Sequence, residues 1–183
     1  LPDSQSQLGR VNKYTAYALL GKVLLYQDKF NEAASALDNV IGVYSLVSDY
    51  GSQFLRFGEN GPESVFEIQY SNQSNWYDWG CAHCSEGNYA IIMNGPRGWS
   101  GPEYAQGWSF NIPTAEFYNS FEEGDSRRDA TVLDIEAFAA ATGSSYTEGY
   151  DHTGYFNNKY IPRAGESGGQ TELNYLTNFR IIR

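Results

Sequence analysis

The clearest pattern of apolar and polar positions lies in residues 11–42. Apolar residues recur there at three- and four-residue spacings, on either side of a short break at Asp28 and Lys29. These spacings are typical of amphipathic helices. We expect Asn31 to cap the second helix and Gly42 to end it. The pattern therefore predicts a helical hairpin.

The hairpin also has the spacing of a tetratricopeptide unit. Its positions follow the pattern W-x2-L-G-x2-Y…A-x3-F with aromatic and aliphatic replacements. The matching residues are Tyr17, Leu20, Gly21, Leu24, Ala33 and Leu37. The small side chains of Gly21 and Ala33 would let the two helices approach closely. One such unit cannot bury its apolar face alone, so we expect partners outside this chain or in its later part.

A short alternation of apolar and polar residues follows the hairpin. Phe66, Ile68 and Tyr70 fall on one face of an extended chain, whereas Glu67 and Gln69 fall on the other. This pattern is typical of a half-buried strand.

The rest of the chain is rich in loops. Residues 71–112 show no regular period, and Thr114 caps a predicted helix that runs to residue 121. A further helix is expected over residues 135–141, ended by Gly143, and a short strand around residues 156–161. The predicted fold is mainly α: a tetratricopeptide-like helical hairpin, part of an α-superhelix, in residues 1–47. A loop-rich ligand-binding region with short helices and a few short β-strands would fill residues 48–183.

Charge and composition narrow the function. The net charge of −10 argues against nucleic acid as a partner. No apolar stretch approaches the roughly 20 residues that span a bilayer. The chain has 15 Tyr, 10 Phe and 4 Trp, more aromatic rings than a small core requires. This composition favours loops that present aromatic rings to a ligand.

Several blocks of sequence resemble the SusD/RagB family, in the order that the family has them. The blocks are GRVNKY leading into ALLGKVLLYQ (9–27), YSL with Tyr50 and Phe54, ESVFEIQ (63–69), PT through FEEGDSRRD (113–129), TGY with KY (153–160) and NFRIIR (178–183). Ser126 stands where the family commonly has proline. Each block is weak alone, but together they cover nearly the whole chain.

The resemblance implies an interior piece of a longer protein that binds oligosaccharide without cleaving it. Such proteins carry a lipid anchor, here expected outside this chain, and lie on the extracellular face of the outer membrane. The resemblance also implies a TonB-dependent transporter barrel as the partner that receives the glycan. No cofactor is expected.

The candidate ligand site is the aromatic part of the loop region. All four tryptophans lie there: Trp76, Trp79, Trp99 and Trp108. Sugars need aromatic planes for a ring face, and amide, carboxylate or guanidinium groups for the hydroxyls. We therefore select Trp76, Tyr77 and Trp79 as stacking residues, Asn75 and Asp78 as hydroxyl partners, and Arg97 and Trp99 as a second contribution. The alternative is that these rings fill a small core under the loops.

Two other groups of residues invite chemical readings. Cys81 and Cys84 form a C-x-x-C, which leaves three alternatives open: a local disulfide, free thiols, or metal or redox chemistry. A structural zinc site needs four ligands, which this motif does not supply, so we expect no metal. The carboxylates of residues 122–129 alternate with Arg127 and Arg128. We expect Asp125 to cap a turn and the arginines to pair with carboxylates, so that none is catalytic.

Three functions compete. The first is glycan binding for uptake, with a peptide as the cargo in some family members. The second is a tetratricopeptide scaffold for a protein partner. The third is a glycoside hydrolase fragment, which would need two carboxylates facing each other across an aromatic cleft.

Overall fold

The computed structural model describes residues 1–71, 80–81, 86–166, 175 and 177–182. The chain forms two compact units. The hairpin unit contains Leu1–Asp49, Phe57–Gln69 and Asn178–Arg183, and the loop unit contains Tyr50–Arg56 and Tyr70–Thr177. Within the described residues there are six α-helices and two two-stranded sheets.

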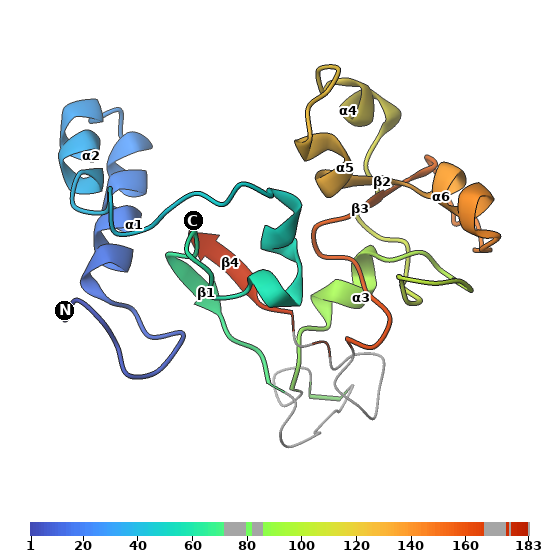
Figure 1. The fold of residues 1–183 in the computed structure, drawn as a ribbon, viewed down its shortest axis with the longest axis horizontal. Helices are drawn as coiled ribbons and strands as arrows, with labels where there is room; N and C mark the ends of the chain where they lie inside the picture. Colours follow the sequence, from blue (N-terminus) through green and yellow to red (C-terminus); the bar gives the residue numbers. More distant parts are fainter. Residues whose placement is uncertain (72–79, 82–85, 167–174, 176, 183) are drawn as a thin grey trace. The chain divides into compact units, whose positions relative to one another are not determined.

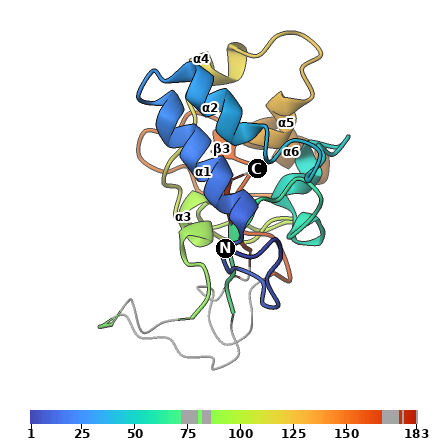
Figure 2. The same cartoon turned by 90° about the vertical axis from the view of Figure 1, so that its left-hand side faces the viewer.

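The hairpin unit contains both of the predicted helices, α1 (Lys13–Leu25) and α2 (Phe30–Leu37), which lie side by side (Figures 1 and 2). Asn12 caps α1, because its side-chain oxygen accepts a hydrogen bond from the Thr15 backbone N–H at 2.8 Å. A Cβ built on Gly21 would lie 2.6 Å from the branched end of Leu37. The glycine therefore permits the close contact of the helices that its spacing predicted.

The predicted ends of the second helix are wrong. Asn31 lies inside α2, whose N-cap is Lys29 without a side-chain capping bond, and α2 ends at Leu37 rather than at Gly42. The reason is the turn before it. Asp28 adopts a φ of +58°, and the Lys29 N–H donates to the Leu24 carbonyl at 3.0 Å. The chain thus re-enters helical geometry at Phe30.

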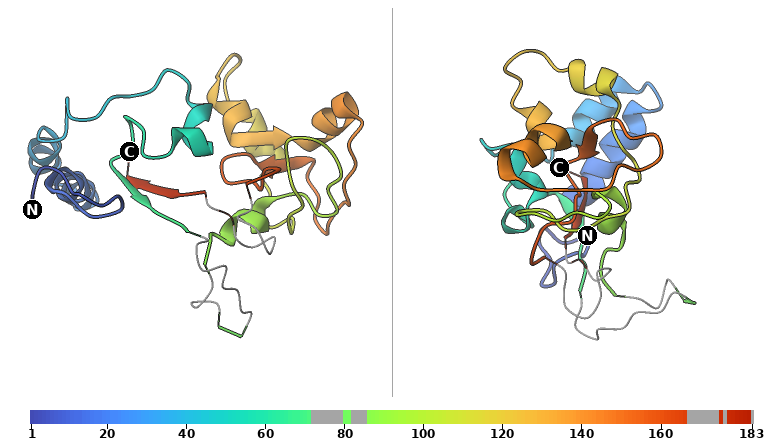
Figure 3. Two further views of the ribbon diagram at one scale, coloured as in Figure 1. Left: turned by 60° about the horizontal axis from the view of Figure 1, so that its bottom comes forward. Right: turned by 90° about the vertical axis from the view of Figure 1, so that its right-hand side faces the viewer.

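The other part of the hairpin unit is an antiparallel pair of strands, β1 (Phe66–Ile68) and β4 (Phe179–Ile182) (Figure 3). The predicted strand is present, but its alternation is inverted with respect to the interior. Glu67 is 2% exposed whereas Ile68 is 41% exposed. The inversion follows from the register, which pairs Glu67 with Arg180.

Glu67 and Arg180 form a buried ion pair. Arg180 Nε lies 2.6 Å from Glu67 Oε1, and the two side chains are 3% and 0% exposed, respectively. The carboxylate also accepts hydrogen bonds from the Asn60 backbone N–H (3.0 Å) and from Asn178 Nδ2 (3.2 Å). These bonds supply the partners that a buried carboxylate requires.

The loop unit is built from short elements connected by long loops. Its elements are the 3-10 helix Gly51–Phe54, α3 (Ala90–Asn94), α4 (Ala115–Asn119), α5 (Arg127–Thr131), β2 (Val132–Asp134), α6 (Ile135–Thr142) and β3 (Tyr155–Asn157); a second 3-10 helix spans Arg56–Gly58. β2 and β3 are antiparallel. The core beside them consists of Trp99, Tyr104, Leu133, Ile135, Phe156 and Ile161.

Two of the predicted helix boundaries in this unit are confirmed. The Thr114 hydroxyl accepts from the Phe117 N–H at 3.2 Å and caps α4. Gly143 ends α6 in the left-handed conformation, with a φ of +69°. The prediction that residues 71–112 are loop missed α3, because five residues are too short to show a helical period. No described helix is long and apolar enough to cross a membrane.

Loss of the buried ion pair should unfold the hairpin unit first. We expect Arg180→Met to lower the free energy of unfolding by about 3–5 kcal/mol, because it leaves the Glu67 carboxylate buried without its cation. Urea denaturation followed by circular dichroism measures the loss. Asp3→Asn, which removes the exposed Lys13–Asp3 pair, is the matched control and should cost far less stability, because solvent screens an exposed ion pair. Equal losses in the two variants would contradict this account.

The loop unit should lose stability in alkali through Tyr104. Burial raises the pKa of Tyr104 to about 12, and the Glu103 carboxylate adds to the rise. The neutral phenol is thus favoured in the folded state, so this contribution is complete below pH 10 and is lost as the pH rises from 10 to 12. The shift corresponds to about 3 kcal/mol. Urea denaturation at increasing pH should show a smaller alkaline loss in Tyr104→Phe than in the parent protein.

Candidate binding surface

Two described residues flank the aromatic segment predicted as the ligand site, Ser71 before it and Glu86 after it. Ser71 Oγ donates a hydrogen bond to Glu86 Oε1 at 3.3 Å. Burial raises the pKa of Tyr70, and the neighbouring Tyr89 adds to the rise. Tyr89 directly precedes the first residue of α3.

A buried asparagine holds the start of α3. Asn88 is 2% exposed, its backbone N–H donates to the Tyr175 carbonyl at 2.6 Å, and its side-chain amide donates to the Thr177 carbonyl at 2.8 Å. Asn88 thus ties α3 to a segment almost ninety residues further along the chain. This contact fixes the helix on which the site depends.

Residues 107–111 run beside α3 and the turn that follows it. Trp108 N–H donates to the Ile92 carbonyl, and Phe110 N–H donates to the Met93 carbonyl, both at 2.8 Å. The close approach needs glycine on both sides, because a Cβ on Gly107 would lie 2.3 Å from the Cα of Gly95. The backbone beneath Trp108 is therefore held firmly.

Aromatic rings and a guanidinium lie at the start of α3, in the turn after it and on residues 107–111. Tyr89 is 45% exposed and Phe110 is 49% exposed. The Trp108 ring is half-buried and meets Phe110 edge to face, with 6.3 Å between the ring centroids. Arg97 is exposed, and its Nη2 donates to the Trp108 carbonyl at 3.0 Å. We call Tyr89, Arg97, Trp108 and Phe110 the α3 surface.

The chemistry of the α3 surface is that of a carbohydrate contact. Aromatic rings offer planes to the C–H faces of a sugar, and a guanidinium offers several N–H donors to its hydroxyls. The carbonyl bond holds Arg97 beside Trp108 but occupies only part of the donor set of the guanidinium. Arg97 and Trp108 together thus supply both kinds of group that a sugar requires.

The structure separates the predicted site residues. Asn75, Trp76, Tyr77, Asp78 and Trp79 lie outside the described residues. Arg97 lies on the α3 surface. Trp99 is a core residue, 9% exposed, with its ring centroid 5.9 Å from those of Tyr104 and Phe138. The selection of Trp99 as a ligand contact is therefore wrong, and the alternative that the ring fills a small core is the one that holds for it.

The sequence interpretation passed over Trp108, Tyr89 and Phe110. It favoured residues 75–79 because polar and aromatic side chains alternate there within a few positions. Around Trp108 the polar partner, Arg97, is eleven residues away in sequence. The available signal was the tryptophan itself, in a segment without helical or strand periodicity.

Cys81 is disulfide-bonded, which is one of the alternatives that the C-x-x-C left open. Cys84, the other cysteine of the chain, lies outside the described residues. The described ranges contain no cluster of His, Cys, Asp and Glu that could hold a metal ion.

The acidic cluster after α4 has the structural role predicted for it. Asp125 accepts from the Arg127 backbone N–H at 2.9 Å and pairs with its guanidinium at 2.6 Å. The Arg127 hydrogen bonds lower the pKa of Asp125 to about 2. Arg128 pairs with Asp129 at 2.9 Å. These two carboxylates are paired with arginines.

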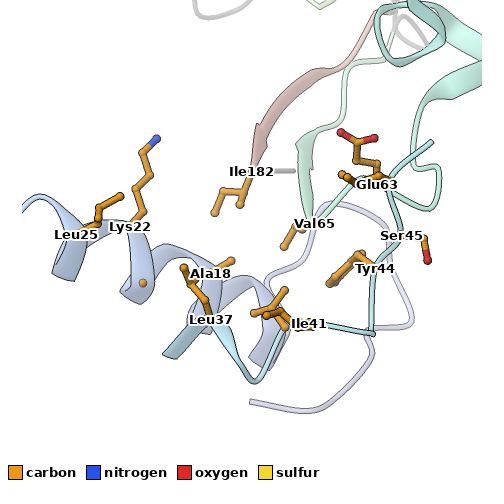
Figure 4. A pocket seen from close by; sticks show the side chains of 13 residues that line it. Ala18, Lys22, Leu25, Leu37, Ile41, Tyr44, Ser45, Glu63, Val65 and Ile182 are labelled. Atoms are coloured by element: carbon orange, nitrogen blue, oxygen red, sulfur yellow. The ribbon is translucent and has the colours of Figure 1, made fainter. Parts of the chain in front are cut away.

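The hairpin unit has a hollow whose chemistry differs from that of the α3 surface (Figure 4). It has a volume of about 490 Å³, and its lining is mostly aliphatic, including Ala18, Leu25, Leu37, Val65 and Ile182. Aliphatic walls offer neither aromatic planes nor many donors and acceptors to a sugar. We call this hollow the hairpin groove; its chemistry suits the packing of another protein segment.

Comparison with known proteins shows what the chain is similar to. No protein-family model matches it. SusD-like protein P2 of Formosa agariphila is 28% identical over an alignment of 192 positions. The alignment covers 96% of this chain and 36% of that protein.

Solved structures match over the whole chain. A laminarin-binding SusD-like protein has a TM-score of 0.88 and 38% identity, and 44% of it is covered. Surface glycan-binding protein A from Bacteroides thetaiotaomicron, in complex with laminarihexaose, has a TM-score of 0.88 and 30% identity, and 43% of it is covered. The chain is thus similar to SusD-like proteins, as its sequence blocks indicated, and it spans 36–44% of the length of these proteins.

Packing of residues 107–111 against the turn after α3 should be sensitive to one methyl group. We expect Gly107→Ala to lower the free energy of unfolding by about 1–3 kcal/mol, because its Cβ meets backbone that cannot move away alone. Gly149→Ala is the control, since a Cβ there makes only ordinary contact with Ser109 at 3.5 Å. Thermal or urea unfolding of both variants measures the difference; an unaffected Gly107→Ala would show that the segment is not tightly packed.

Proposed function

We propose that this protein binds oligosaccharide at the cell surface without cleaving it. Sugar stacks on the rings of the α3 surface and on Trp76, Tyr77 and Trp79, and hydroxyls bind to Arg97. The observation that carries the proposal is the α3 surface itself, where the exposed Arg97 guanidinium donates to the Trp108 carbonyl and the Trp108 ring packs edge to face on Phe110. Tyr89 adds an exposed ring at the start of α3.

The relatives support a glycan as the ligand class. One solved relative is named for laminarin binding, and another was solved with laminarihexaose. Laminarin oligosaccharides are therefore the first ligands to test for this chain. The proposed stacking residues of the aromatic segment are Trp76, Tyr77 and Trp79, with Asn75 and Asp78 as hydroxyl partners.

Binding rather than hydrolysis fits the described carboxylates. A glycosidase needs one carboxyl group that donates a proton and a second that attacks or activates water. Asp125 has a lowered pKa, so it is ionised at neutral pH and does not suit the role of proton donor, and its pairing with Arg127 gives it a structural role. The relatives are likewise named as glycan-binding proteins.

Delivery of the bound glycan to a TonB-dependent transporter is the proposed consequence of binding. We place the protein on the extracellular face of the outer membrane, held by a lipid anchor outside this chain. The superhelix of tetratricopeptide-like repeats is also part of the proposal, with α1 and α2 as one unit. The chain supplies only 36–44% of the length of its relatives, so these roles belong to the longer protein.

The hairpin groove favours a second candidate function, that of a scaffold for a protein partner. Its aliphatic lining suits a helix better than a sugar. A scaffold leaves the α3 surface without a role, whereas a glycan-binding protein can use both surfaces. A family member with peptide cargo is the remaining alternative, and it would bind peptide at the α3 surface in place of sugar.

Titration with laminarihexaose, followed by tryptophan fluorescence and calorimetry, tests the proposal. We expect Trp108→Ala to weaken binding roughly tenfold or more, because a tryptophan that anchors a ligand carries a large share of the binding energy. Trp76→Ala and Trp79→Ala should also weaken it. Tyr150→Ala is the matched control, since this ring is 96% exposed and lies outside the proposed site.

Each competing function gives a different outcome in the same titration. A hydrolase would release reducing ends from the hexasaccharide, and a scaffold would bind none of it. Normal affinity in Trp108→Ala, Trp76→Ala and Trp79→Ala together would overturn the site assignment. Binding of neither laminarihexaose nor any member of a glycan array would overturn the function.

A further inference from the structure

The loop unit has a groove of its own, which lies beside α4. It consists of two adjoining hollows of about 330 and 430 Å³, which share Phe117, Thr131 and Lys159 in their linings. Volumes of this size are typical of small-ligand sites. We call the two hollows together the α4 groove; its linings include none of the residues of the α3 surface.

The exposed ring of Phe117 is built into the groove by the anchoring of its neighbour. Tyr118 stacks on Tyr155 of β3, with ring centroids 4.5 Å apart and an interplanar angle of 22°. The Arg128 guanidinium covers Tyr118 at 4.9 Å. Successive residues of a helix point about 100° apart, so anchoring of Tyr118 turns Phe117 outward. Phe117 is 46% exposed, and Phe121 supports its ring edge to face at 5.3 Å.

Polar groups surround this ring. Lys159 Nζ lies over the rings of Tyr50 and Phe54, at 5.3 and 4.9 Å from their centroids, which holds the ammonium in place. An ammonium carries three N–H donors. Arg127 and its partner Asp125 line the larger of the two hollows, and Asn111 and Asn157 line the smaller one.

We propose that the α4 groove is a second saccharide-binding site, in which the Phe117 ring takes the face of a sugar and Lys159 and Arg127 bind hydroxyls. The proposal rests on the proposed function for its class of ligand. It adds a site on other elements, α4, α5 and β3, whereas the first site is built on α3 (Figure 1). Two sites on one protein would strengthen its hold on a polymer beyond its affinity for a short oligosaccharide.

The lining favours a sugar over a protein segment in this groove. An apolar helix or strand needs a continuous aliphatic wall, such as the hairpin groove offers. The α4 groove instead combines one exposed ring with amide, ammonium and guanidinium groups. This combination matches a ring face bordered by hydroxyls.

Native mass spectrometry with laminarihexaose and affinity gels with laminarin test the proposal. We expect the purified protein to bind two hexasaccharides, Phe117→Ala and Trp108→Ala to bind one each, and the double variant none. Laminarin should retard Phe117→Ala at least roughly threefold less than the parent protein. Phe117→Tyr should keep the second site, and Tyr150→Ala should behave as the parent protein does. Thermal unfolding checks that each variant is folded.

The outcomes separate the second site from the proposed function. A parent protein that binds one hexasaccharide, with unchanged gel retardation in Phe117→Ala, overturns the second site and leaves the first intact. The second site is also overturned if Trp108→Ala still binds a hexasaccharide and the double variant, with Phe117→Ala added, binds it equally well. A parent protein that binds no saccharide overturns the proposed function, and the second site with it. Phe117-dependent capture of peptide without sugar assigns the groove to a peptide instead.

Discussion

The buried ion pair between Glu67 and Arg180 is the contact on which the rest of the structure depends. Its two residues are 113 positions apart in sequence, and they join β1 to β4. A charge in the interior is costly unless its partners are held in place, so the pair tolerates few alternative registers. The Asn178 amide also bonds to Gln69 at 3.0 Å, so the two ends of the segment that carries the candidate sites are held together.

Within the loop unit, the short elements are held in place by contacts between residues distant in sequence. Asn88 ties α3 to residues 175 and 177, and backbone hydrogen bonds hold residues 107–111 against α3. Tyr118 and Tyr155 anchor α4 in a similar way. Short elements held by such contacts can present exposed aromatic rings in fixed positions, which limits the entropy that binding a sugar would cost.

Distribution of the aromatic residues separates packing from recognition. Trp99 lies in the core, whereas Trp108, Phe110 and Phe117 keep part of their rings at the surface. All four belong to a stretch of the chain with similar composition. Which ring is buried depends on β2, β3 and α6, which surround Trp99, and the composition of the stretch alone does not reveal it.

The sequence by itself determined the hairpin, the Thr114 cap, the Gly143 helix end, the Asp125 turn and the likeness to SusD-like proteins. Each of these depends on residues within a few positions of one another, or on blocks whose order survives in the chain. Tertiary structure alone decided that Glu67 faces inward, that Trp99 is core and that Arg97 lies beside Trp108. The partners are Arg180 for Glu67, Phe138 for Trp99 and Trp108 for Arg97, from 11 to 113 residues away in sequence. Local periodicity carries no information about such partners.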